Sequence, residues 1–197
     1  MIIKSFTMLI DQGDFSKSED FQVIKDQILH GIASVSWPEG TDKFLLYPER
    51  HGNGVKPIKD SFVRHLKGHG WDTETEVDIA TQIRPGPIDL TTIVRNKLFA
   101  VEWETGNVSS SHRAVNKMAM GIYKGIFIGG ILIVPTKETA YYLTDRIGNY
   151  EELEPYFPLW RSFNCKDGFL GIIGIQHDET SAEVPRITKG TDGRSQI

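Results

Sequence analysis

The sequence predicts an α/β fold with a mixed central β-sheet flanked by helices on both faces. From residue 74 onward, segments with the spacing of strands alternate with segments that have the spacing of helices, which is typical of a sheet covered on both sides. Residues 128–134 are apolar throughout, as in a strand buried on both faces. The chain of 197 residues can enclose a full core. It contains no visible repeat or linker, so we expect a single domain over residues 1–197.

Two amphipathic helices are predicted in the first part of the chain. Residues 18–35 repeat apolar side chains at helical spacing, and Ser18 or Asp20 can cap the start. The apolar stripe of this helix consists of Phe21, Ile24, Ile28 and Ile32. A polar loop with several glycines and prolines follows at residues 36–55. The second helix, at residues 57–67, ends before Gly68 and Gly70.

Strands dominate the middle of the chain and alternate with helices in the second half. Residues 74–79, 88–94 and 98–103 read as strands, and the last two are close enough to form a hairpin. A helix is expected at residues 109–124, followed by the buried strand at 128–134. Helical segments at 137–146 and 151–160 precede a last strand at 169–175.

The composition indicates a soluble, cytoplasmic protein. Hydrophobic residues make up 39% and charged residues 24% of the chain, which is normal for a globular domain. Cys165 is the single cysteine, so no intramolecular disulfide can form, and it reads as a core thiol. The N-terminus lacks the pattern of a secretion signal, and no apolar run approaches the roughly 18 residues of a membrane span. We therefore expect no membrane partner.

The charge distribution is compatible with a nucleic-acid partner, although the net charge is not. A net charge of −4 argues mildly against nucleic acid. Residues 105–125, however, contain Arg113, Lys117 and Lys124 and no acid, and residues 186–197 are also locally basic. Two basic segments in an acidic chain can form a groove whose far wall holds catalytic carboxylates. Ordinary charge scatter explains the same pattern equally well.

Three carboxylates on the predicted hairpin carry the chemical signal. Asp89 lies on one strand, and Glu102 and Glu104 lie on its neighbour. Residues two apart on a strand face the same way, so the two glutamates project together while Trp103 points to the opposite face. Alternatively, the glutamates form the solvated face of an edge strand, and Asp89 is a turn residue next to Pro87.

A divalent cation would resolve the repulsion among these carboxylates. Magnesium prefers a few carboxylate oxygens and keeps positions open for a phosphate, and manganese can substitute for it. We assign Asp89 and Glu102 as metal ligands, the Trp103 carbonyl as an additional ligand, and Glu104 as the group that deprotonates or orients water. The histidines are scattered without zinc spacing, so a zinc site is not predicted.

Longer segments add a second signal, and they are GPIDL, ETGNVSSSHRAVNKMAMG, AYYLTDRIGNYEELEPYF and VPRITKGTDGRS, preceded by SWP and NGVKPIK. In the same order and with similar gaps, these segments resemble the BamHI family of type II restriction endonucleases. The resemblance covers most of the chain from about residue 36 onward.

The resemblance implies a restriction-endonuclease-like fold of the PD-(D/E)XK type and a magnesium-dependent homodimer that cuts double-stranded DNA at the palindrome GGATCC. Asp89, Glu102 and Glu104 match the family's catalytic carboxylates. Glu74 falls near a further acidic, metal-binding position, although the gap that follows it differs from the family's. Many nucleases of the wider superfamily carry lysine where Glu104 stands, and the BamHI family shares the glutamate. A cognate DNA methyltransferase is the expected functional partner.

The resemblance also assigns residues that read DNA bases. Asp145 and Arg146 would read an outer G·C pair, Arg113 and Asp192 the middle pair, and Asn107 with Ser109 the inner A·T pair, in agreement with the groups these side chains offer to base edges. The C-terminal segment around Gly190 and Arg194 would also lie at the DNA. Without the resemblance, Asp145 and Arg146 are helix-end charges, and Asn107 and Ser109 are helix caps.

The related dimers imply which helices pair the two subunits. The helices at residues 109–124 and 151–160 are the expected contact. The apolar and aromatic side chains predicted to be buried there are Met118, Ile122, Tyr123, Tyr156, Phe157 and Trp160.

Two other functions compete with a restriction enzyme: a non-catalytic DNA-binding protein with a nuclease fold, and a repair or recombination nuclease. An inactive relative would have lost a carboxylate, and a repair nuclease would not need the base-reading set.

Overall fold

A six-stranded mixed β-sheet forms the centre of the molecule. The computed structural model describes residues 1–79 and 86–190. In the sheet the strands follow the order β1 (Ile2–Gln12), β7 (Gly168–Gln176), β6 (Phe127–Pro135), β5 (Lys97–Trp103), β4 (Ile88–Val94) and β3 (Asp72–Thr75). Strands β5, β6 and β7 are parallel, and the other neighbours pair antiparallel. A separate parallel pair joins β2 (Leu45–Leu46) to β8 (Glu179–Thr180).

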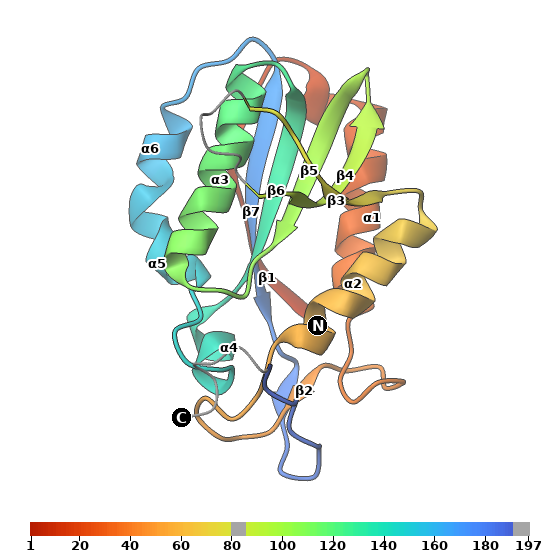
Figure 1. Cartoon of the computed structure of the whole chain (residues 1–197), viewed down its shortest axis with the longest axis vertical. Coiled ribbons are helices and arrows are strands. Elements are labelled where there is room, and N and C mark those ends of the chain that lie inside the picture. Colours follow the sequence, from red (N-terminus) through yellow and green to blue (C-terminus); the bar gives the residue numbers. More distant parts are fainter. Residues whose placement is uncertain (80–85, 191–197) are drawn as a thin grey trace.

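Helices cover both faces of this sheet, as the sequence predicted (Figure 1). On one face α1 (Glu19–Ala33) and α2 (Lys56–Gly68) enclose a core with the short helix η1 (Phe15–Lys17). On the other face α3 (Val108–Tyr123), α5 (Tyr150–Leu153) and α6 (Phe157–Arg161) enclose a second core. The helix η2 (Glu154–Tyr156) links α5 to α6, and α4 (Lys137–Tyr142) follows β6.

Local sequence explains the elements that carry the site. All nine residues of β6 are buried, as expected for a central parallel strand. Gly130 lets α3 lie close to that strand, because a Cβ there would approach the sulfur of Met118 to 2.6 Å. Ser18 caps α1 through a bond from the Phe21 N–H, as predicted. The parallel strands β5, β6 and β7 all end at the lower end of Figure 1, where the loops before α3 and around α4 gather.

Several predicted boundaries were wrong. Strand β1 was not predicted, because two register shifts along it break the alternation that marks a strand. Strand β3 spans residues 72–75 instead of 74–79. The helix expected at residues 137–146 ends at Tyr142. The stretch at 151–160 divides into α5, η2 and α6, with prolines at the start of the last two. In the described part of the chain, no helix is long and apolar enough to cross a membrane.

Candidate functional site

Asp89 and Glu102 meet where β4 and β5 separate. The last paired residues of the two strands are Leu90 and Val101. Beyond them, the Asp89 N–H donates to Glu102 Oε2 at 3.3 Å, and the Trp103 N–H donates to Asp89 Oδ2 at 2.9 Å. The two carboxylates thus accept backbone N–H groups where the ladder between the strands has ended. Their juxtaposition agrees with the hairpin prediction.

Glu102 and Trp103 face opposite sides of the sheet, as expected for adjacent strand residues. The Trp103 ring packs on Phe62 of α2, with ring centroids 4.7 Å apart. The Glu102 side chain faces α3, where Lys117 lies. Glu104 follows the end of β5, and its Oε1 accepts the Gly106 N–H at 2.6 Å. Glu102 is buried, so the solvated edge-strand interpretation is wrong for this residue.

Two lysines neutralise the carboxylates from opposite faces of the sheet. Lys117 Nζ, from α3, lies 2.5 Å from Glu102 Oε1, and both side chains are about nine-tenths buried. Lys59 Nζ, from α2, donates to Asp89 Oδ1 at 2.5 Å. An unpaired buried carboxylate is costly, so these ammonium groups stabilise the carboxylates where they lie.

Burial perturbs the protonation of both glutamates. Burial is the main cause that raises the pKa of Glu102 above its usual value, the charge of Asp89 adds to it, and Lys117 opposes both. Burial also raises the pKa of Glu104, against the opposing hydrogen bond from the Gly106 N–H. Carboxyl groups with a raised pKa in a polar cluster are typical of catalytic sites.

Glu74 lies on the strand next to Asp89. Strand β3 pairs Thr73 with Leu90 and Thr75 with Ile88, which places Glu74 opposite Asp89 in the register. Its backbone has a φ of 52°, an unusual value for a residue with a side chain. The side chain is exposed, and in residues 1–79 and 86–190 the structure records no hydrogen bond or ion pair for it. The metal-binding role of Glu74 stays a prediction.

The carboxylate oxygens of the site are the type of ligand that magnesium prefers, although they do not converge on a single cation position. Asp89 and Glu102 supply hard carboxylate oxygens, and the Asp89 backbone N–H donates to the Glu102 carboxylate. Within the described residues, no group of three acidic, histidine or cysteine side chains converges as a cation would require. Each carboxylate holds a lysine instead. The oxygens that a cation would use are therefore the ones that Lys59 and Lys117 contact here.

The N-terminal part of α3 presents three of the predicted DNA-reading residues. Asn107, Ser109 and Arg113 are exposed. Asn107 caps the helix, and its Oδ1 accepts the Ser110 N–H at 3.1 Å, so the capping interpretation is confirmed for this residue. Arg113 lies one helical turn before Lys117 on α3. Candidate base readers and the lysine that contacts Glu102 therefore share one helix.

Asp145 and Arg146 lie in the loop after α4 and not at a helix end. Both side chains are more than two-thirds exposed, and Arg146 has a φ of 65°. The Gly148 N–H donates to the Gly106 carbonyl at 2.8 Å, which fastens this loop beside the start of α3. A Cβ on Gly148 would lie 2.7 Å from the Val108 backbone, so this close approach requires glycine.

The C-terminal segment reaches the same end of the molecule. The Gly54 N–H donates to the Ile187 carbonyl at 2.7 Å, and a Cβ on Gly54 would overlap the Thr188 carbonyl. The Asn53 side chain donates to the carbonyls of Tyr47 and Tyr142 and accepts the Ile187 N–H. Asn53 thus connects the C-terminal segment to α4. Gly190 is exposed at the end of the described segment. The predicted DNA contacts Asp192 and Arg194 lie outside the described residues. We use the term recognition surface for Asn107, Ser109, Arg113, Asp145, Arg146 and Gly190.

Comparison with known proteins decides the family. The model of the family "Restriction endonuclease BamHI" matches residues 1–194. This chain belongs to the BamHI family. It is 51% identical to the type II restriction enzyme OkrAI of Oceanobacter kriegii, over 99% of either chain. It is 37% identical to the type II restriction enzyme BamHI of Bacillus amyloliquefaciens, over 91% of this chain and 86% of that enzyme.

Solved structures support the same fold. The restriction endonuclease BglII in complex with a DNA 16-mer superposes with a TM-score of 0.62, covering 90% of this chain and 79% of BglII, at 11% identity. Free BglII gives a TM-score of 0.51 over 90% of this chain and 81% of BglII, again at 11% identity. The restriction-endonuclease-like fold predicted from the sequence is confirmed. This member of the BamHI family is a DNA-binding endonuclease, and therefore a hydrolase.

The structure corrects the expected dimer surface of this BamHI family member. Met118, Ile122, Phe157 and Trp160 are buried within the subunit, so they form core and not contact surface. Tyr123 and Tyr156 are exposed and remain available for such a contact, and Met120 of α3 and Leu159 of α6 are exposed as well. Trp160 donates to Asn116 at 2.9 Å, which joins α6 to α3. We call Met120, Tyr123, Tyr156 and Leu159 the α3–α6 face.

Sequence reasoning missed the two lysines as site residues. Lys117 was noted only as part of a basic segment, and Lys59 only as the last residue of the segment NGVKPIK. The pairing of each lysine with a carboxylate depends on helices that lie far from the hairpin in sequence. A signal was available for Lys117, because it lies four residues after Arg113 on a predicted helix.

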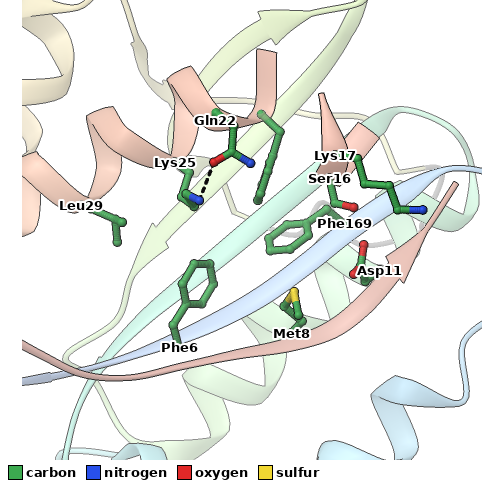
Figure 2. A pocket seen from close by; sticks show the side chains of 10 residues that line it. Phe6, Met8, Asp11, Ser16, Lys17, Gln22, Lys25, Leu29 and Phe169 are labelled. Atoms are coloured by element: carbon green, nitrogen blue, oxygen red, sulfur yellow. Dashed lines mark hydrogen bonds between the residues drawn. The ribbon is translucent and has the colours of Figure 1, made fainter. Parts of the chain in front are cut away.

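A hollow elsewhere on the molecule takes no part in this site. Figure 2 shows a pocket of about 440 Å³ between β1 and α1, lined by aromatic and aliphatic side chains such as Phe6, Met8 and Phe169. None of the predicted site residues lines it. Lys25 at its rim is paired with Gln22 on its own helix.

Proposed function

We propose that this enzyme hydrolyses phosphodiester bonds at the palindrome GGATCC in double-stranded DNA, as a magnesium-dependent homodimer. The exact site rests on the base-reading set: arginine donates to guanine, aspartate accepts from cytosine, and asparagine matches adenine. Its members would read the sequence GGA in each half-site. The enzyme would act in the cytoplasm of a prokaryote, beside a methyltransferase that protects the same site in the host DNA.

One observation carries the proposal. Glu102, which accepts the Asp89 N–H, contacts Lys117 near the middle of α3, and the exposed residues at the start of this helix belong to the recognition surface. Chemistry and recognition thus adjoin at the end of the sheet where the parallel strands finish, which is where α/β proteins bind their ligands. A bound DNA duplex could then contact both sets of residues at once.

The chain's own residues would divide the work as follows. Asp89 and Glu102 would hold the cation, with the Trp103 carbonyl and Glu74 as further candidates. Magnesium, when bound there, would polarise the phosphodiester and lower the pKa of a water molecule. Glu104 would orient that water or accept its proton, and burial raises the pKa of this carboxyl group above its usual value, which makes it a stronger base.

The homodimer follows from the symmetry of the proposed site. A palindrome presents two identical half-sites, and a twofold dimer matches them with two copies of one recognition surface. The α3–α6 face is the proposed contact, because it exposes four large apolar or aromatic side chains on elements that are packed together.

Plasmid digestion tests the proposal. The protein is incubated with a plasmid that carries one GGATCC site, with magnesium, and the ends are sequenced. We expect a single cut within GGATCC in both strands, and no cut in a plasmid whose site differs by one base pair. Cuts at unrelated sequences would indicate a repair nuclease, and binding without any cut would indicate a non-catalytic protein.

Two isosteric variants test the active site itself. Glu102→Gln and Asp89→Asn should reduce the cleavage rate by about 10³-fold or more, on the scale of several kcal/mol of lost transition-state stabilisation. Specific binding of GGATCC should remain, because these residues act on the cation and not on bases. Cleavage near the wild-type rate in either variant would remove that residue from the active site.

A further inference from the structure

The two lysines at the carboxylate pair differ in how they are held. Lys117 has a side chain that is 10% exposed, and it contacts three oxygens: Glu102 Oε1 at 2.5 Å, the Pro87 carbonyl at 2.9 Å and the Gly86 carbonyl at 3.3 Å. Two of these contacts are hydrogen bonds to backbone carbonyls and the third is an ion pair. Lys117 thus fastens the segment before Asp89 to α3.

Lys59 is held loosely by comparison. Its side chain is 32% exposed, and across residues 1–79 and 86–190 the structure records one acceptor for it, Asp89 Oδ1 at 2.5 Å. Two of its three N–H donors are therefore open to solvent. Lys59 lies in the first turn of α2, which begins two residues after Gly54, whose N–H donates to the Ile187 carbonyl of the C-terminal segment. Its backbone is thus well anchored while its ammonium group can change partner.

The reaction gives such an ammonium group a purpose. Negative charge on the phosphoryl oxygens must be balanced as the phosphodiester is attacked, and preformed N–H donors do so effectively in a partly dry site. The end of the catalytic strand β5 offers no such group, because position 104 is a glutamate. The charge of Lys59 does act at Glu104, where it is among the groups that favour the ionised carboxylate.

We propose that Lys59 binds the phosphate that is cut, and thereby supplies positive charge to it from α2. The inference rests on the proposed active site around Asp89 and Glu102. In the free enzyme Lys59 neutralises Asp89. A divalent cation held by Asp89 would compete with Lys59 for that carboxylate, and the Lys59 ammonium group would then be available to the phosphate of the bound DNA.

Neutralising a single phosphate tests this contact by binding alone. The cut position is mapped first, and a GGATCC duplex is then made with an uncharged methylphosphonate in place of the phosphate that is cut. Its dissociation constant is compared with that of the unmodified duplex in calcium. The measurement is short enough that slow cutting consumes little of the DNA. For the wild-type enzyme, we expect the methylphosphonate to weaken binding by about tenfold, the scale of one charge-assisted hydrogen bond.

The Lys59→Met variant should lose this sensitivity. It should bind both duplexes with dissociation constants within about twofold of each other. The variant has no ammonium group at position 59, so it gains nothing from the negative charge that the methylphosphonate removes. Lys67→Met is the matched control, since it makes the same change on the exposed part of α2 and should keep the wild-type ratio. Lys59→Arg keeps a positive charge beside Asp89 and should restore most of the ratio.

The outcomes separate the failure of this inference from failure of the active site. If Lys59→Met remains as sensitive to the methylphosphonate as the wild-type enzyme, Lys59 does not bind that phosphate. Wild-type binding that ignores the methylphosphonate overturns the inference without any variant, so a folding defect in Lys59→Met cannot protect it. Cleavage that persists in Glu102→Gln and Asp89→Asn would instead overturn the active site on which the inference rests.

Discussion

Lys117 Nζ lies 2.5 Å from Glu102 Oε1, and this contact joins the helix that begins at the recognition surface to the strand that carries the carboxylates. Arg113 precedes Lys117 by one helical turn. One helix therefore carries both a candidate base reader and the lysine that contacts Glu102.

Removing Lys117 should destabilise the enzyme in the absence of metal. Lys117→Met leaves the Glu102 carboxylate buried without its partner, which costs about 3–5 kcal/mol for pairs of this kind. In EDTA, the melting temperature should fall by about 10 °C. The double variant Lys117→Met/Glu102→Gln should recover much of the loss, because no charge is then left unpaired. A double variant as unstable as the single one would show that the ion pair is not the cause.

Stability of the metal-free enzyme should depend on pH through Glu104. Burial raises the pKa of this carboxyl group above the value of 4.5 that it has in the unfolded chain. The folded state therefore favours the protonated form, and the stabilisation this brings is complete below pH 4.5 and is lost as the pH rises through the folded-state pKa. Glu104→Gln, which cannot ionise, should gain stability relative to the wild-type enzyme over that rise and then keep a constant advantage.

This comparison is measured by urea unfolding in EDTA between pH 4 and pH 8. A difference in free energy of unfolding that stays constant with pH would contradict the raised pKa of Glu104. If the advantage of Glu104→Gln shrinks as the pH rises, the pKa of Glu104 is lowered on folding instead of raised. The hydrogen bond from the Gly106 N–H would then outweigh burial.

Cleavage should require a small divalent cation. We expect full activity with magnesium, activity with manganese, and slow or no cutting with calcium, which is larger and binds in a looser geometry. Specific binding with calcium should remain. The measurement is a time course of plasmid cleavage with each ion after dialysis against EDTA. Undiminished cleavage in excess EDTA would exclude metal dependence.

Arg146→Ala should weaken selection of the outer G·C pairs. Each dimer would lose two guanine contacts, each worth on the order of 1–3 kcal/mol of discrimination, and the remaining binding should be weak and sensitive to salt. Arg95→Ala is a suitable control, because Arg95 lies in the β4–β5 turn at the other end of the hairpin and pairs with Asp20. Competition binding with duplexes altered at the outer pair measures the effect. An Arg146→Ala variant that still prefers GGATCC would remove this residue from the recognition surface.

A charge on the α3–α6 face should prevent dimer formation. Leu159 is 59% exposed in the subunit, and Leu159→Glu would place two charges at a twofold contact. Val23→Glu is the control, since Val23 is similarly exposed at 57% on α1. In sedimentation velocity we expect the wild-type enzyme and Val23→Glu as dimers and Leu159→Glu as a monomer. A wild-type enzyme that sediments as a monomer and binds DNA as one copy per site would overturn the homodimer.

The sequence by itself determined the helices and strands of the centre and the chemistry of the hairpin. Residues 128–134 are continuously apolar, which was enough to place a buried strand. The spacing of Glu102 and Trp103 fixed their opposite faces, because side chains alternate along any strand. Longer motifs identified the family, which no single spacing could have done.

Only the tertiary structure decided which groups surround the carboxylates. Lys59 and Lys117 approach Asp89 and Glu102 from helices on opposite faces of the sheet, and nothing in the local sequence shows how those helices cross it. The same holds for Met118 and Trp160, whose apolar character fits a core or a dimer contact equally well. Hydrophobic burial is proportional to area and has no direction, so the sequence can show that such a side chain is covered, while the packing of the helices determines what covers it.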